Sequence, residues 1–189
     1  MMKKGYDILS NHPINVERMK RGLNPANSLW FWGAGTRPML TSFEEKTGHK
    51  GAMISAVDLL KGIAVGAGMK VIEVEGANGG LDTNYEGKAD AAVDVLLNGG
   101  CDFAYIHLEA PDEMGHQGSY ERKVKAIENL DKRIIKRVVE KMEAAGEDFR
   151  MLVLPDHPTP VAIRTHVSDP VPYLSLIHIS EPTRQEAIS

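Results

Sequence analysis

Short apolar runs alternate with longer stretches of helical periodicity through most of the chain. Four runs have the length and continuity of buried strands: residues 51–55, 71–74, 103–108 and 151–154. Between them, three stretches carry apolar positions at helical spacing: residues 56–67, 85–97 and 119–145. Continuous apolar strands that alternate with helices are typical of parallel sheets. The pattern therefore predicts an α/β fold, with a mostly parallel sheet and helices on both faces.

The first part of the chain departs from this pattern. Residues 14–21 have the periodicity of one or two helical turns, and residues 24–27 carry a turn signal. Residues 28–32 are a short aromatic strand candidate, and Thr41 is a candidate N-cap for a helix over residues 42–47. We expect residues 1–27 to be the end of an inserted or linking segment, and residues 28–173 to form one domain.

Composition and charge exclude some classes of partner. The chain has 22 Lys and Arg against 26 Asp and Glu, so it lacks the basic surplus of a nucleic-acid-binding protein. Cys101 is the only cysteine, which excludes an internal disulfide and fits a reducing compartment. No apolar run reaches the roughly 18–20 residues that span a bilayer, and the first residues do not predict a signal peptide, since no apolar segment follows their charges. We expect a cytoplasmic protein without nucleic-acid or membrane partners.

Candidate metal ligands follow two of the predicted strands. Asp112 and His116 come after residues 103–108, while Asp156 and His157 come after residues 151–154. His166 follows within ten residues of this second pair. Sites in parallel sheets lie at the carboxyl ends of the strands, and Asp and His ligands suit a borderline divalent metal. The alternative for each group is an ordinary surface turn, but five such side chains at one edge favour a metal site.

Two arginines are candidates for binding an anionic substrate. Arg37 follows a glycine-containing turn that would let the backbone approach a ligand closely. Its guanidinium could bind a phosphate or carboxylate through two parallel hydrogen bonds. Arg164 lies two residues before His166 and is a second candidate. The alternative for Arg37 is a tight turn with a solvated side chain.

Eight stretches of the sequence carry a resemblance to a known family: residues 9–18, 24–27, 32–35, 51–59, 82–86, 109–116, 125–131 and 154–158. Together they resemble the cofactor-independent phosphoglycerate mutases of the archaeal type, within the alkaline phosphatase superfamily. The resemblance extends over residues 7–173 and implies that residues 28–173 are a partial, alkaline phosphatase-like metal-binding domain. It also implies interconversion of 3-phosphoglycerate and 2-phosphoglycerate through a phospho-enzyme intermediate, without 2,3-bisphosphoglycerate.

The resemblance further implies a site with two divalent metal ions, which could be Mn, Zn, Co or Mg. Asp112, His116 and His166 would hold one ion, while Asp156 and His157 would share the other with an aspartate and a nucleophilic Ser or Thr. The family carries these last two residues in an amino-terminal part that this sequence lacks, so we expect an inactive internal fragment of a longer enzyme. The small partner would be a phosphorylated glycerate.

Other functions fit the same residues. The chain could belong to a homoserine kinase-like enzyme or another phosphotransferase or phosphatase of the superfamily, or it could be a non-catalytic metal-binding module. Residues beyond 173 follow neither the strand pattern nor the helix pattern. Within them, residues 176–185 resemble translated sequencing-adapter read-through at the ends of assembled gene fragments. We therefore expect residues 174–189 to be a non-native tail.

Overall fold

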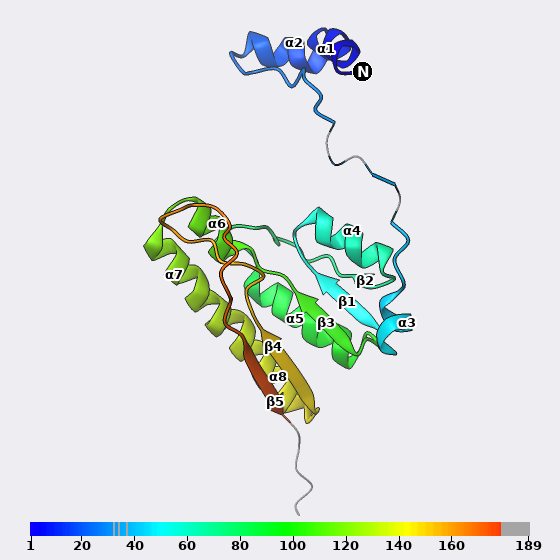
Figure 1. Cartoon of the computed structure of the whole chain (residues 1–189), viewed down its shortest axis with the longest axis vertical. Coiled ribbons are helices and arrows are strands. Elements are labelled where there is room, and N and C mark those ends of the chain that lie inside the picture. Colours follow the sequence, from blue (N-terminus) through cyan, green and yellow to red (C-terminus); the bar gives the residue numbers. More distant parts are fainter. Residues whose placement is uncertain (32, 34, 37, 179–189) are drawn as a thin grey trace, which may run out of the picture. The chain divides into compact units, whose positions relative to one another are not determined.

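The computed structural model describes residues 1–31, 33, 35–36 and 38–178, and it divides the chain into two compact units (Figure 1). The first unit is Met1–Pro38 and the second is Met39–Ser189. Among the described residues, none of the helices has both the length and the apolar character needed to cross a membrane.

The first unit contains two short helices, α1 (Met2–Ser10) and α2 (Pro13–Lys20). The His12 side chain caps α2 by accepting a hydrogen bond from the backbone N–H of Ile14. The buried Asn15 donates to the carbonyls of Leu9 and Ala26, which fixes the following loop against the helices. The predicted strand over residues 28–32 is wrong for residues 28–31, which form no regular element, and residue 32 lies outside the described part.

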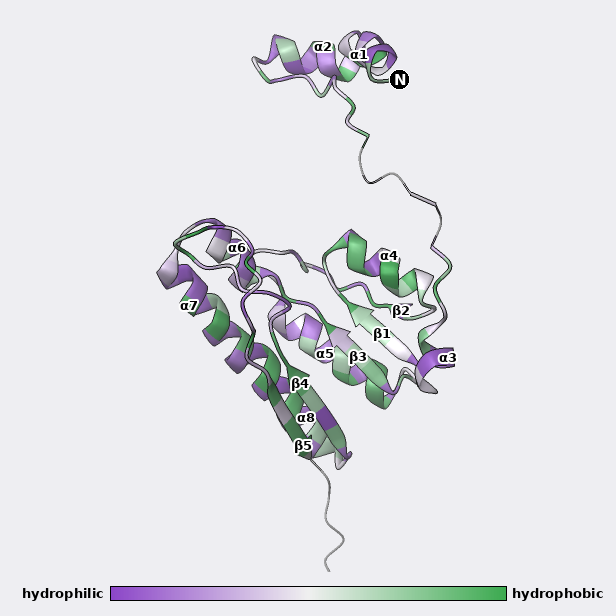
Figure 2. Cartoon of the chain, viewed as in Figure 1, coloured by the Kyte–Doolittle hydropathy of each residue, from purple (hydrophilic) through white to green (hydrophobic). Residues whose placement is uncertain are grey.

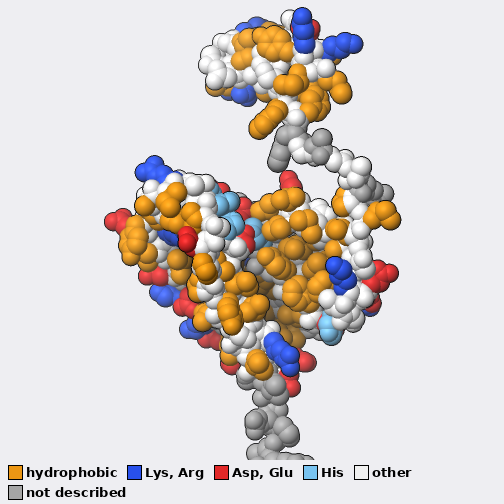
Figure 3. Space-filling view, in the orientation of Figure 1, with side chains coloured by type: hydrophobic (Ala, Val, Ile, Leu, Met, Phe, Trp, Pro, Cys, Tyr) orange, Lys and Arg blue, Asp and Glu red, His pale blue; other side chains and the backbone are white. Residues whose placement is uncertain are grey.

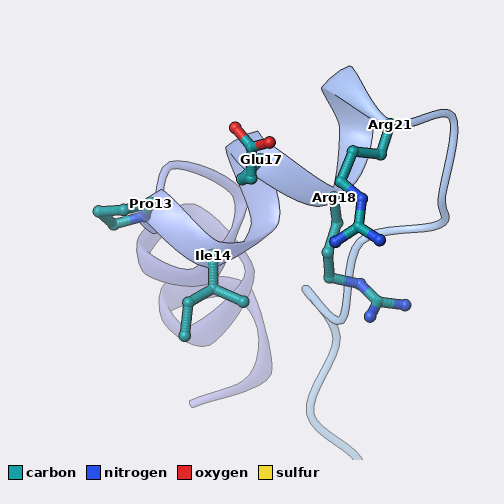
Figure 4. Close-up of a pocket in the computed structure, with 5 residues that line it drawn as sticks. All are labelled: Pro13, Ile14, Glu17, Arg18 and Arg21. Carbon is teal, nitrogen blue, oxygen red and sulfur yellow. The ribbon is translucent and has the colours of Figure 1, made fainter.

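A pocket in the first unit lies against α2 (Figure 4). It is lined by Pro13, Ile14, Glu17, Arg18 and Arg21. The Arg18 side chain is already engaged, since its Nε donates to the carbonyl of Asn24 at 2.9 Å. The pocket lining contains one carboxylate and no histidine, so it does not match the chemistry predicted for residues 112–166.

The second unit is built on a parallel sheet with the order β2–β1–β3, visible side by side in Figure 1. Its strands are β1 (Gly51–Ile54), β2 (Lys70–Val71) and β3 (Phe103–Ile106). Helix α4 (Asp58–Gly66) connects β1 to β2, and α5 (Tyr85–Leu97) connects β2 back across β1 to β3. Right-handed connections in opposite directions place these helices on opposite faces. The predicted α/β fold with helices on both faces is confirmed.

A long helical segment packs against α5 and forms the main core. It consists of α7 (Tyr120–Asn129), the π-helical η1 (Leu130–Ile135) and α8 (Lys136–Ala145). The sequence predicted one continuous helix over residues 119–145 and missed the π segment. The apolar faces of these helices (Figure 2) meet in a cluster of buried side chains: Tyr85, Ala89, Val93, Ala110, Met114, Ala126, Ile134, Val138 and Met142.

Two ion pairs fix the register between α5 and the helical segment. Arg133 binds Glu86 through two hydrogen bonds of 2.6 and 2.7 Å, and Arg137 binds Asp90 through two of 2.6 and 2.8 Å. Both partners advance by one helical turn from the first pair to the second, so the two helices run parallel. The Arg137 guanidinium lowers the pKa of Asp90 from 3.8 to about 2.

The last two strands form a separate antiparallel pair, β4 (Phe149–Val153) with β5 (Leu174–His178). The described parallel sheet therefore has three strands, and β4 lies outside it. The expectation that nothing regular follows residue 173 is wrong for residues 174–178. Leu174 and Leu176 lie opposite Val153 and Met151, so apolar side chains face each other across the pair. Residues 179–189 lie outside the described part.

Several element boundaries differ from the predictions. Ser42, not Thr41, caps α3 (Phe43–Thr47), because it forms a reciprocal capping box with Glu45. The predicted helix over residues 56–67 begins at Asp58. Of the predicted strand over residues 71–74, only Val71 belongs to β2 (Lys70–Val71). Asp112 and His116 lie in the short helix α6 (Ala110–His116).

Candidate metal centre

Helix α6 places Asp112 and His116 on one face. Pro111 occupies the first turn of this helix, where its missing N–H costs no hydrogen bond. Residues four apart on a helix are neighbours on its surface, and His116 Nε2 lies 3.4 Å from Asp112 Oδ2. The third group, His166, comes from the loop between β4 and β5. Its Nε2 lies 3.3 Å from Asp112 Oδ1 and 3.1 Å from His116 Nε2.

These three side chains converge closely enough to share one ion. One ligand atom from each of Asp112, His116 and His166 lies within 4.8 Å of the others. A carboxylate oxygen and two imidazole nitrogens are a donor set that suits zinc, manganese and similar divalent ions. Asp112 and His116 are partly buried, whereas His166 is exposed, so the group is open on one side. The residues present therefore fit a metal ion.

The backbone of Arg164 fixes the orientation of His116. His116 Nδ1 lies 3.0 Å from the Arg164 carbonyl oxygen. A carbonyl only accepts hydrogen bonds, so Nδ1 carries the proton and the Nε2 lone pair faces Asp112 and His166. Arg164 is also the one non-glycine residue with a positive φ, 59°, among the described residues. Backbone strain of this kind is characteristic of functional sites.

The side chain of Arg164 lies across Gly118, where a Cβ atom would collide with the guanidinium. The sequence predicted Arg164 as a substrate contact and missed the role of its carbonyl. The Arg164 side chain is exposed, and its contact with a substrate stays a prediction. The other predicted substrate contact, Arg37, lies outside the described residues.

The second pair of predicted ligands follows β4 and lies beside the first group. The ring of His157 packs against the ring of His166, with centroids 3.7 Å apart. Asp156 has a side chain that is 66% exposed, and its Oδ1 accepts the backbone N–H of His157 at 3.0 Å. Asp156 Oδ2 lies 3.5 Å from His157 Nε2. All five predicted ligands thus gather in one region, although only three of them form a convergent set.

Thr159 contacts both groups of predicted ligands. Its hydroxyl donates a hydrogen bond to Asp112 Oδ1, and the same oxygen lies 3.3 Å from His157 Nδ1. Its side chain is buried, and the sequence reading missed it. The available signal was a hydroxyl two residues after the Asp-His pair, held between Pro158 and Pro160.

A buried polar cluster lies at the carboxyl end of β3, and the sequence reading missed this cluster too. Lys88 is fully buried, and its Nζ donates to the carbonyls of Asn78 and His107 at 3.4 and 3.3 Å. Burial lowers the pKa of Lys88 and raises the pKa of Glu109, while the positive charge of Lys88 partly offsets the effect on Glu109. The signal in the sequence was a lysine on the buried stripe of α5, three residues after Tyr85.

His107 belongs to the same cluster. Its Nδ1 lies 3.3 Å from the hydroxyl oxygen of Ser55. Burial lowers the pKa of His107, and the charge of Asp156 opposes that effect. The cluster therefore borders the predicted ligands without contributing a ligand to the convergent set.

An apolar surface adjoins the histidines. Figure 3 shows His side chains near α6 beside a broad area of hydrophobic side chains over β1, β3 and α4. Phe103 and Tyr105 of β3 are 39% and 41% exposed, since they alternate with Ala104 and Ile106, which face the core side with α5. One face of the strand that leads to α6 is therefore left partly uncovered.

Comparison with protein families assigns the chain. The model of the Metalloenzyme superfamily matches residues 9–186, nearly the whole sequence. The chain belongs to the Metalloenzyme superfamily. Divalent metal binding is a property of this superfamily, and the convergent set of Asp112, His116 and His166 agrees with it.

This Metalloenzyme superfamily chain has curated relatives of high similarity. It is 54% identical over 173 residues to a protein from Methanosarcina barkeri named 2,3-bisphosphoglycerate-independent phosphoglycerate mutase. It is 49% identical over 174 residues to a Geobacter sulfurreducens protein with the same name, marked as probable. Each alignment covers 92% of this chain but 43% of the relative. The chain therefore spans less than half the length of these relatives.

Two solved structures share the fold. A protein from Pyrococcus horikoshii matches with a TM-score of 0.80 and 35% identity, covering 93% of this chain and 45% of that chain. The cofactor-independent phosphoglycerate mutase of Thermoplasma acidophilum matches with a TM-score of 0.56 and 30% identity, covering 93% and 40%. The fold of this superfamily member is thus one found within longer proteins.

Proposed function

We propose that this chain is the metal-binding part of an enzyme that interconverts 3-phosphoglycerate and 2-phosphoglycerate. The observation that carries the proposal is the convergence of Asp112, His116 and His166 in a chain about half identical to proteins named phosphoglycerate mutase. The substrate would be a small phosphorylated glycerate, and 2,3-bisphosphoglycerate would not be required. The reaction would pass through a phosphorylated Ser or Thr that lies outside this chain.

The proposed enzyme holds two divalent ions, for which Mn, Zn, Co and Mg are the candidates. Asp112, His116 and His166 hold one ion. Asp156 and His157 contribute to the second, together with residues outside this chain. When bound, such ions lower the pKa of a hydroxyl nucleophile and neutralise charge on a transferring phosphoryl group. The proposed role of the Arg37 and Arg164 side chains is to bind the anionic groups of the substrate.

The supporting chemistry of this chain concerns orientation. The Arg164 carbonyl holds the Nδ1 proton of His116, so the opposite nitrogen faces the other ligands. Helix α6 carries Asp112 and His116 one turn apart, so both lie on one face of the same helix. The buried Lys88 offsets part of the negative charge of Glu109, the residue that precedes α6.

The test measures interconversion of the two phosphoglycerates by phosphorus NMR, without 2,3-bisphosphoglycerate. It uses the 189-residue chain and any longer polypeptide that its gene encodes. We expect metal-dependent interconversion in the longer polypeptide, loss of it in His116→Ala, and retention in the control His49→Ala. His49 is an exposed histidine whose described ion-pair partner is Asp102, and it belongs to neither ligand group.

Three results would contradict the proposed mutase activity. ATP-dependent phosphorylation of homoserine would indicate the kinase-like alternative, and release of inorganic phosphate alone would indicate a phosphatase. A gene that encodes only these residues, with metal binding and no turnover, would indicate a non-catalytic metal-binding module.

A further inference from the structure

Thr159 occupies a buried position between the two groups of predicted ligands. The residue is 2% exposed and follows β4, flanked by two prolines. Its hydroxyl donates a hydrogen bond to Asp112 Oδ1 on one side, and the hydroxyl oxygen lies 3.3 Å from His157 Nδ1 on the other. A single side chain therefore touches a ligand from each group.

The one proton of the hydroxyl determines the direction of both hydrogen bonds. An ionised carboxylate only accepts, so the Thr159 proton goes to Asp112. The Thr159 oxygen must then accept from His157, which requires the proton of that ring to be on Nδ1. In the neutral ring, His157 Nε2 is then left with its lone pair, on the side of the ring where Asp156 Oδ2 lies at 3.5 Å. The hydroxyl thus sets the tautomer of His157 and the orientation of Asp112 together.

The backbone of Thr159 is itself fixed from two sides. Lys123 of α7 donates to its carbonyl oxygen at 2.6 Å. Gly115 of α6 approaches the same oxygen so closely that a Cβ atom at Gly115 would collide with it. The position of Thr159 therefore follows α6 and α7, which also determine where Asp112 and His116 lie.

We propose that Thr159 is a positioning residue that orients Asp112 and His157 for metal binding and couples the two ligand groups. This inference rests on the proposed function, because it assigns Thr159 a role toward the ions of that site. Supporting residues of this kind, which hydrogen-bond to metal ligands, commonly change metal affinity about 10–100-fold when they are removed.

The first test compares the binding of Mn²⁺ by calorimetry in Thr159→Val, Thr159→Ser and the matched control Thr83→Val. Valine keeps the shape of threonine and removes the hydroxyl, whereas serine keeps the hydroxyl. Thr83 is equally buried, and its hydroxyl oxygen accepts the backbone N–H of Asn78, which is not a predicted ligand. We expect about 10–100-fold weaker binding in Thr159→Val, with Thr159→Ser and Thr83→Val within a few-fold of the wild type.

The second test reads the tautomer directly in the metal-free wild-type chain. We expect the nitrogen-15 chemical shifts of His157 to show a protonated Nδ1 and an unprotonated Nε2, and Thr159→Val to show a mixture of the two tautomers. A proton on Nε2 in the wild type, or wild-type Mn²⁺ affinity in Thr159→Val, would overturn the inference. If the wild type binds no Mn²⁺, the proposed metal centre fails, and the tautomer measurement still decides the role of Thr159.

Discussion

The two groups of predicted ligands differ in how firmly this chain holds them. Asp112 and His116 share one short helix, and each has a partner that fixes its orientation: Thr159 for Asp112 and the Arg164 carbonyl for His116. Asp156 is largely exposed, and within the described part of the chain its hydrogen bond and its close ionic contact are both to the adjacent His157. The first group is therefore preorganised by these 189 residues, while the second depends on whatever else surrounds it.

This difference suggests how such a site is divided between parts of a polypeptide. A ligand set carried by one helix and one loop can reach its geometry once those two segments pack. A pair of adjacent residues cannot enclose an ion alone, because four or more donors are usual around these metals. We expect the 189-residue chain to bind metal chiefly at Asp112, His116 and His166.

The strongest test removes a ligand from the preorganised group. At a Mn²⁺ concentration 100 times the dissociation constant, the wild-type chain should gain ~2.7 kcal/mol of unfolding free energy. His116→Ala should gain almost none, because one of three converging donors is gone. Denaturant unfolding with and without Mn²⁺ measures this difference, and His49→Ala is the control. An equal gain in His116→Ala and the wild type would exclude these residues as the principal ligands.

A paired substitution compares the two groups directly. Asp112→Asn and Asp156→Asn make the same chemical change, a carboxylate to an amide, in the first and second group. We expect Asp112→Asn to weaken Mn²⁺ binding at least about 10-fold, as for the loss of other oriented groups at metal sites, and Asp156→Asn to change it far less. Calorimetric titration of the 189-residue chain measures both. Equal losses would show that the second group is as well formed as the first.

The packing of α6, which carries Asp112 and His116, can be tested at the contact between Gly115 and the Thr159 carbonyl. A methyl group at Gly115 would meet the carbonyl of Thr159, so Gly115→Ala should destabilise the metal-free chain by about 1–3 kcal/mol. Gly62, in α4, is the matched control, since nothing lies within 4 Å of a Cβ atom there. Gly62→Ala should stabilise the chain by about 0.5–1 kcal/mol. Thermal unfolding compares the two, and a harmless Gly115→Ala would contradict the close approach of α6 to Thr159.

The smallest expected effect is a loss of folding stability at low pH. The two ligand groups can be compared only at pH values above this loss. The pKa of Asp90 is about 2 in the folded chain and 3.8 without its partners. A carboxyl group with a lowered pKa stabilises the fold above pH 3.8, and this contribution is lost as the pH falls toward 2. Stability of the metal-free chain should therefore decrease over that range.

Asp90→Asn removes this carboxyl group, so its stability should fall less than that of the wild type between pH 3.8 and pH 2. Asp94→Asn, on the same helix beside the uncharged amide of Asn98, should follow the wild type. Urea unfolding at several pH values measures the curves. Identical curves for Asp90→Asn and the wild type would show that the ion pair with Arg137 contributes nothing to stability.

The sequence predicted the elements that periodicity determines and the candidate ligands that follow them. Asp112 and His116 follow strand β3, as predicted from the mostly apolar run over residues 103–108. The family resemblance also grouped His166 with Asp112 and His116, and the structure brings the three side chains together. Periodicity could not place His166, since a loop of irregular backbone has no period from which its path can be computed. Thr159 was missed for the same reason: its partners are distant in sequence, and a single hydroxyl leaves no pattern.

Two further differences have local physical causes. The π segment Leu130–Ile135 keeps helical spacing on both sides, so the sequence alone does not distinguish it from an ordinary helix. Strand β4 was expected to join the parallel sheet, but its partner is β5, with apolar residues facing each other across the pair. Strand pairing depends on which segments meet in three dimensions, and a strand pattern does not encode its neighbour.

The left-handed backbone at Arg164 has a consequence for protein engineering. A non-glycine residue in this conformation is disfavoured by roughly 1–2 kcal/mol, whereas glycine adopts it readily. A search for thermostable variants that ranks substitutions by folding energy alone would therefore select glycine at this position. The same change would loosen the carbonyl that orients His116. Position 164 is thus a place where greater heat tolerance and accurate placement of a predicted metal ligand are opposing goals.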